Sequence, residues 1–257
     1  MNLFPIKAFL PCLFLLLAAP LTWGAGAGTG KWESAHQAFA AGRYQEALKS
    51  YQEVIGTEGH SASRLFNLGN TFAKLEQTGP AVLAYEQAAL LAPRDPAIKN
   101  NLQLVRPANP AIFPAPPAWY KTPLFWLSLH EWSWLTLAGT GLFSLAVLAM
   151  LTLPDRNHRF RIIAPSLLGV GAALAMAGGL ALHQRWSEKN LAILLSPEPT
   201  LRLSPFATAD PIPATATAST GQRVIPGPRQ DGWLHVSVPG TQIAGWIPEN
   251  EVAKIIP

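Results

Sequence analysis

The sequence is poor in cysteine and in charge. Cys12 is the only cysteine among 257 residues, so neither a disulfide nor a multi-cysteine metal site can form within one chain. Charged residues make up only 13% of the chain, about half their usual share in soluble proteins. The 19 Lys and Arg residues are not gathered into the basic stripe that nucleic-acid binding requires. We therefore expect neither a disulfide scaffold nor a nucleic-acid-binding protein.

Recognisable catalytic motifs are also lacking. The six histidines are scattered without metal-ligand spacing. The chain has no Gly-x-Ser-x-Gly turn, glycine-rich phosphate loop or cysteine nucleophile in a catalytic setting. We expect a non-enzymatic protein without catalytic residues, cofactor or metal. The alternative, an envelope enzyme, would need an activity that substitution of His36 or His235 abolishes.

Charge is missing completely from two long segments. Residues 133–153 and 162–182 contain no ionisable group, and each would span about 31 Å as a helix, the thickness of the hydrocarbon core of a bilayer. Two such segments so close together predict a transmembrane helical hairpin. A hairpin buried inside a soluble protein is the alternative.

The short loop between these segments fixes the expected orientation. Residues 154–161 include three arginines and a histidine, and short basic loops stay in the cytoplasm. Residues 1–27 have the order of a secretory signal peptide, with Lys7, an apolar run and then small residues; an uncleaved anchor is the alternative. Both arguments place the parts before and after the hairpin outside the cytoplasm.

Three further patterns surround the two spans. Gly171, Ala175 and Gly179 recur every four residues and predict close packing against the first span, or assembly with another membrane protein. The prolines of segment 107–132 predict an extended spacer that holds the preceding domain off the bilayer. Aromatic residues near its end predict an interfacial anchor, with a ligand cage as the alternative; they are Trp119, Tyr120, Phe125, Trp126, Trp132 and Trp134.

Residues 28–106 repeat with a period of 34. This offset pairs Ala47 with Ala81 and Tyr51 with Tyr85, and the pattern resembles the tetratricopeptide (TPR) repeat. The resemblance implies an all-α repeat domain with inner helices at about 30–41 and 62–75. A last helix after Asp95 and Pro96 would cap the stack with a face made by Ile98, Leu102 and Val105.

The resemblance also implies a groove that binds peptide segments or partner helices. Asn67 and Asn70 do not predict capture of a C-terminal carboxylate, because the accompanying lysines of that arrangement are not all present. A merely solvated position is the alternative for each polar residue. The groove residues would be Trp32, Glu33, His36, Phe39, Phe66, Asn67, Asn70 and Lys74.

Residues 188–257 change to short β-like runs separated by Pro and Gly. The five runs at 191–195, 200–204, 222–226, 232–238 and 243–248 predict a small all-β barrel. With its two Gly-Trp pairs, this segment resembles a bacterial SH3-type (SH3b) domain. Trp233 and Trp246 are expected to be core residues at least in part, with ligand stacking as the alternative.

The order of these parts resembles the BatE proteins of bacterial aerotolerance operons. The resemblance implies a multidomain protein of the bacterial inner membrane, with its N-terminal and C-terminal domains in the periplasm. Its expected role is a scaffold for membrane-anchored proteins with von Willebrand factor A domains. A MoxR-type ATPase would be linked only indirectly, because the cytoplasmic loop is too short to dock it. The alternative role is a cell-wall sensor that binds peptidoglycan peptides through the SH3b-like domain.

Overall fold

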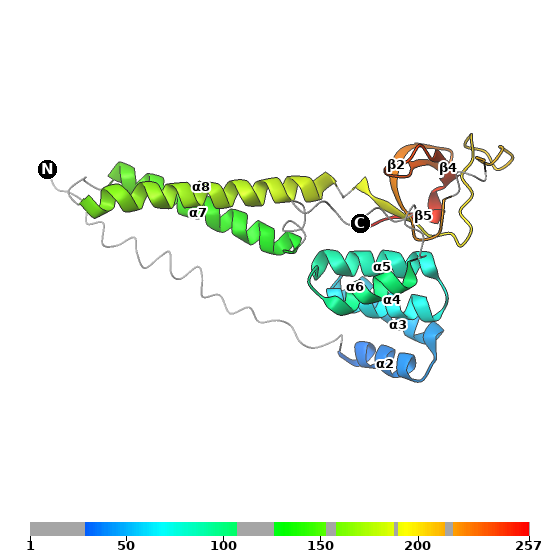
Figure 1. Cartoon of the computed structure of the whole chain (residues 1–257). Helices are drawn as coiled ribbons and strands as arrows, with labels where there is room; N and C mark the ends of the chain where they lie inside the picture. Colours follow the sequence, from blue (N-terminus) through cyan, green and yellow to red (C-terminus); the bar gives the residue numbers. More distant parts are fainter. Residues whose placement is uncertain (1–28, 107–125, 153–157, 188–189, 214–217, 257) are drawn as a thin grey trace.

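The computed structural model describes residues 29–106, 126–152, 158–187, 190–213 and 218–256. Within them the chain forms seven α-helices and one five-stranded sheet (Figure 1). The predicted signal peptide, most of the proline-rich segment, and Trp119, Tyr120 and Phe125 lie outside the described residues.

The first five helices form antiparallel pairs and a closing helix. The predicted inner helices correspond to α2 and α4, and the predicted last helix to α6. Ser61 caps α4 by accepting a hydrogen bond from the backbone N–H of Arg64, and Asp95 caps α6 ahead of Pro96. The helices are α2 (Thr29–Ala40), α3 (Tyr44–Glu58), α4 (Ala62–Lys74), α5 (Thr78–Leu91) and α6 (Pro96–Val105).

Small residues let these helices approach closely. Gly69 of α4 lies under Tyr85 of α5, and a Cβ at Gly69 would stand 2.7 Å from the tyrosine ring. Tyr51 of α3 packs in the same way against Ala35 and Ala38 of α2. Each repeated tyrosine therefore fills the space inside its own helix pair. The other small residues at repeat positions, Ala47, Ala81 and Ala88, are fully buried.

Two helices, α7 (Leu129–Thr152) and α8 (His158–Ser187), are long and apolar enough to cross a membrane. Only 11% and 17% of their most apolar windows are buried, so the hairpin is not enclosed in a soluble core. Its bounds differ from the prediction. α7 begins at Leu129 rather than 133, and residues 158–161 of the predicted loop already belong to α8.

Glycines bring α7 and α8 into contact. A Cβ at Gly171 would lie 2.6 Å from the backbone nitrogen of Phe143, and one at Gly139 would lie 2.6 Å from that of Ala175. Packing against the first span is therefore confirmed for Gly171 and Ala175. It is wrong for Gly179, which has nothing within 4 Å; Gly178 takes its place against α7.

The sheet is antiparallel, in the order β4-β3-β2-β1-β5. β2 pairs with β1 through Arg223 and Val224 and with β3 from Ile225 onward, and the pairing with β3 shifts register between Pro226 and Arg229. The predicted run at 200–204 forms only isolated bridges through Arg202, and the fifth strand lies after a 3₁₀ turn at Glu249–Glu251. The strands are β1 (Ala192–Leu194), β2 (Arg223–Gln230), β3 (Trp233–Ser237), β4 (Ala244–Pro248) and β5 (Val252–Lys254).

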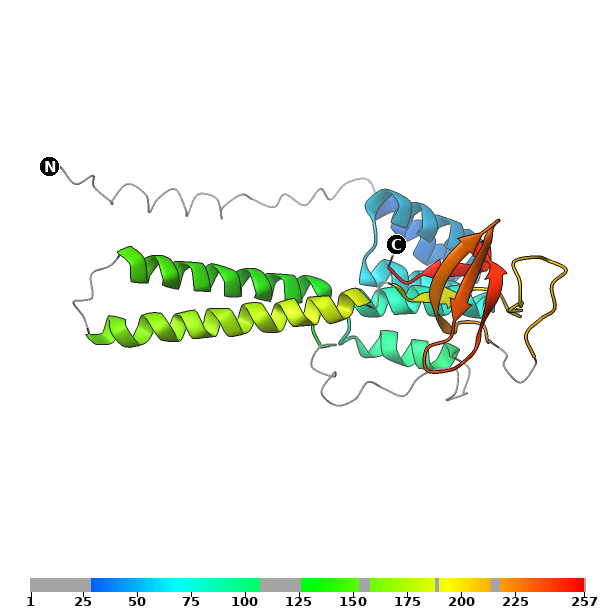
Figure 2. The same ribbon diagram turned by 90° about the horizontal axis from the view of Figure 1, so that it is seen from above.

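The helical part and the sheet lie together at one end of the α7–α8 hairpin (Figures 1 and 2). They share an apolar cluster built by α5, α6, β1 and the C-terminal segment, in which Val82, Ile193 and Ile255 are buried. Arg94, in the turn before α6, forms a 2.5 Å ion pair with Glu131 in the first turn of α7. The helical part therefore contacts the first turn of α7, and most of the predicted spacer lies outside the described residues.

Candidate protein-binding groove

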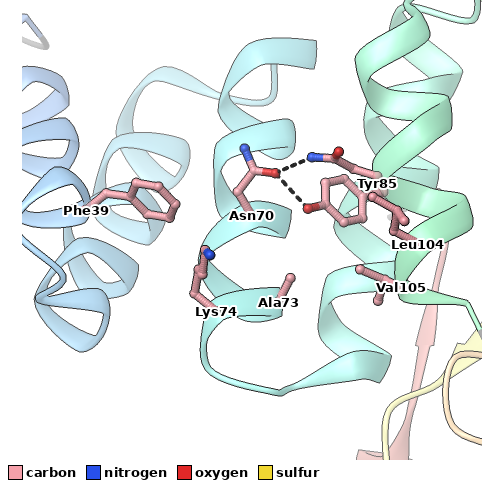
Figure 3. Close-up of a pocket in the computed structure, with 8 residues that line it drawn as sticks. Phe39, Asn70, Ala73, Lys74, Tyr85, Leu104 and Val105 are labelled. Carbon is pink, nitrogen blue, oxygen red and sulfur yellow. Dashed lines mark hydrogen bonds between the residues drawn. The ribbon is translucent and has the colours of Figure 1, made fainter.

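A pocket opens between α2, α4 and α6, with Tyr85 of α5 in its wall (Figure 3). Its volume is about 280 Å³. Phe39 lies on one side, Asn70 and Lys74 lie along α4 in the middle, and the α6 residues lie on the other side. The pocket is lined by Phe39, Asn70, Ala73, Lys74, Tyr85, Asn101, Leu104 and Val105.

Three of the eight predicted groove residues line this pocket: Phe39, Asn70 and Lys74. Trp32 and His36 instead pack on Tyr51, whose hydroxyl lies 3.1 Å from the His36 ring nitrogen Nδ1. The remaining predicted residues are elsewhere in the helical part. Phe66 packs against the Tyr85 ring, the backbone carbonyl of Asn67 accepts a hydrogen bond from Thr71, and Glu33 is exposed.

A hydrogen-bond network orients the polar centre of the pocket. Oδ1 of Asn70 accepts from the hydroxyl of Tyr85 at 2.7 Å and from Nδ2 of Asn101 at 2.8 Å (Figure 3). Burial raises the pKa of Tyr85, so its hydroxyl stays protonated and able to donate at neutral pH. The carbonyl of Asn70 is thus held on the Tyr85 side, and its amide nitrogen points to the opposite side.

The α6 wall of the pocket was missed by the sequence prediction. Leu104 is 82% exposed and lies off the Ile98–Leu102 face that packs against the other helices. An isolated leucine on the polar side of a predicted capping helix was the available signal. Asn101 gave no such signal, because an exposed asparagine is ordinary on a helix surface.

The two tryptophans of the sheet lie on its outer face. Along β3 the side chains of Leu234 and Val236 enter the core, while Trp233 and the residues that alternate with them are only half-buried. Trp246 of β4 meets His235 edge to face, with ring centroids 5.3 Å apart. Trp233 and Trp246 are thus half-buried, on the face of the two strands opposite the core cluster.

A buried carboxylate joins the helical part to the sheet. Glu86 of α5 accepts two hydrogen bonds from Arg223 of β2, at 3.0 and 2.7 Å, and a further one from Arg106. Burial of the Arg106 guanidinium lowers its pKa to about 10, and the nearby positive charge of Arg223 is the second, smaller cause. Nothing in the sequence pairs residues 86 and 223, so this contact could not be predicted.

The N-terminal end of α7 is fixed by a reciprocal cap. Ser128 and Glu131 each accept a hydrogen bond from the other's backbone N–H. Trp132 is buried, whereas Trp126 and Trp134 are exposed. The other three aromatic residues of this set, Trp119, Tyr120 and Phe125, lie outside the described residues.

No protein family, no curated protein and no solved structure matches this chain. The features of the chain that bear on its function are the groove, the outer face of β3 and β4 and the hairpin. Among the described residues, no group of three His, Cys, Asp or Glu side chains could hold a metal ion.

Proposed function

We propose that the chain is a non-enzymatic scaffold of the bacterial inner membrane that docks protein partners in its helical groove. In this proposal the helical part is a TPR-type domain and the sheet an SH3-like barrel. The period of 34 residues and the paired helices support the first assignment. The order of the strands and the 3₁₀ turn between β4 and β5 support the second.

The observation that carries the proposal is the open pocket with an exposed apolar side chain beside it. The side chain of Leu104 is almost fully exposed at the pocket wall. Its apolar surface is in contact with water, which is unfavourable, and it does not contribute to the core. A partner segment laid across α2, α4 and α6 would cover it. The proposed partners are membrane-anchored von Willebrand factor A domain proteins, with a MoxR-type ATPase linked only indirectly.

The topology proposal places both soluble parts in the periplasm. The basic loop between the spans supports a cytoplasmic position for the far end of the hairpin. The common position of the helical part and the sheet at the other end supports one shared compartment for both. Reporter fusions at residue 106 and at the C-terminus should both give periplasmic signals, and a cytoplasmic signal from either would contradict this topology.

Partner docking is tested by purifying the full chain in mild detergent and measuring the amount of each subunit that co-purifies with it. Leu104→Ser should reduce recovery of a membrane subunit with a von Willebrand factor A domain. Leu203→Ser removes an equally apolar exposed side chain from the segment between β1 and β2 and should leave recovery unchanged. Equal recovery with both variants would exclude the groove as the docking site.

A second function, cell-wall sensing, is favoured by the outer face of β3 and β4. Trp233 and Trp246 offer half-buried aromatic surfaces on which a peptidoglycan peptide could stack. Retention of the full chain on purified cell wall, lost in Trp246→Ala, would support sensing. Absence of retention by the wild type would favour the scaffold alone.

A further inference from the structure

We infer that the groove selects partner segments that carry an aspartate or glutamate side chain between apolar residues. This inference rests on the proposed docking function and names the chemistry of the docked segment. It follows from three features of the pocket: which hydrogen-bonding atoms remain to be used, which charge lines it, and where its apolar walls stand.

The network around Asn70 leaves donors facing the groove. Tyr85 and Asn101 occupy both acceptor positions of the Asn70 carbonyl. The amide nitrogen of Asn70 lies on the side away from both partners (Figure 3), so its N–H groups are not used by this network and can donate to a docked segment. Because Tyr85 is buried and holds its proton, this orientation does not change near neutral pH.

The charge of the lining is positive. Lys74 lies one helical turn after Asn70 on α4, so both side chains leave the same face of the helix. Lys74 is exposed and has no ion pair within the described part of the chain. None of the residues that line the pocket is acidic. An ammonium and an amide donor side by side match a carboxylate.

The walls of the pocket are apolar on both sides of this donor pair. Phe39 comes from α2, and Leu104 with Val105 comes from α6 (Figure 3). A segment whose carboxylate reaches Asn70 and Lys74 therefore needs apolar groups before and after the acidic residue. This favours a side-chain carboxylate inside a segment over the carboxylate at a chain end.

In the experiment, the full chain is immobilised in detergent and exposed to short peptides whose two ends are chemically capped. The retention of each peptide set gives its relative affinity. The central residue is Asp, Glu, Asn, Gln or Lys, and the flanking positions are drawn from Leu, Phe, Val and Ser. We expect the acidic sets to bind about tenfold more tightly than the amide sets, the size of one charge-assisted hydrogen bond. K74M should abolish that preference, whereas the control K99M, in an exposed lysine outside the pocket, should retain it.

Other outcomes separate this inference from the docking function. Equal retention of acidic and amide sets, or preference for the lysine set, overturns the carboxylate inference and leaves docking standing. A Gln-centred set with a free C-terminal carboxylate tests whether the groove binds the carboxylate at a chain end. Selective retention of this set overturns the side-chain assignment. Retention of no set removes both the inference and the groove as a docking site. If K74M and K99M have the same unfolding midpoint as the wild type, misfolding is excluded as the cause of any change in peptide binding.

Discussion

At the scale of single residues, the buried charge of Glu86 joins the helical part to the sheet. It is buried between Arg223 and Arg106, which come from different parts of the fold. We predict that Glu86→Gln lowers the free energy of unfolding by about 3 kcal/mol, because it leaves two guanidinium groups facing each other without their counter-charge. Thermal or urea unfolding of the full chain in detergent would measure this.

The control for Glu86 is an ion pair in solvent. Glu53 pairs with Lys31, and both side chains are largely exposed, so Glu53→Gln should leave the unfolding midpoint unchanged. If both glutamate substitutions behaved alike, the Glu86 contact would not hold the two parts of the molecule together.

Tyr51 should make the stability of the helical part depend on pH in the alkaline range. Burial raises the pKa of its hydroxyl to about 12, whereas in the unfolded chain it ionises near its ordinary value of about 10. The folded state then binds the proton more tightly, so stability is fully present below pH of about 10 and falls as pH rises toward 12. The Tyr51→Phe variant should be less stable than the wild type at neutral pH, but its free energy of unfolding should fall less as the pH is raised. Unfolding at a series of pH values would show this, and parallel curves would contradict it.

At the scale of helices, two glycines that look alike in the sequence should respond oppositely to alanine. A Cβ at Gly69 would meet the Tyr85 ring, while one at Gly56 would meet nothing within 4 Å. We predict that Gly69→Ala destabilises the protein by about 1–3 kcal/mol through overpacking. Gly56→Ala should stabilise it by about 0.5–1 kcal/mol, since α3 gains a better helix former. Equal effects in unfolding experiments would disprove the close packing of α4 on α5.

The same scale shows what local patterns can predict. The repeat of small residues and tyrosines, the cap at Asp95 and the two uncharged runs each act within a few turns of chain, and the helices they predict are present. The run at 200–204 was misjudged because strand pairing depends on a partner, β4, that meets it only through Arg202. Gly179 was misjudged because a four-residue spacing drifts around a helix of 3.6 residues per turn.

The groove was predicted in part for a similar reason. The α4 face and Phe39 follow from the helical period, but the wall from α6 depends on how the closing helix sits on the pair before it. The burial of Trp32 and His36 against Tyr51 reflects the approach of α3 to α2. Contacts between distant segments, such as Glu86 with Arg223, have no local signal at all.

At the scale of the whole molecule, α5 is the element on which the other parts meet. One side packs on α4 and α6, another on β1, and the turn after it reaches Glu131 of α7. The helix α5 thus contacts the sheet directly and lies beside the start of the hairpin.

This arrangement predicts that one methyl group can separate the helical part from the sheet. A Cβ at Gly79 would lie 2.5 Å from the backbone oxygen of Leu195, and backbone cannot move aside as a side chain can. Alanine favours the helix by about 1 kcal/mol over glycine, so any loss of stability in Gly79→Ala must come from the contact with the sheet. Hydrogen exchange should then be faster in α5 and β1 of the variant, while β3 and β4, which lie beyond β2 in the sheet, keep their protection. Gly56→Ala serves as the control, and unchanged exchange in both variants would mean that the helical part and the sheet do not share this contact in solution.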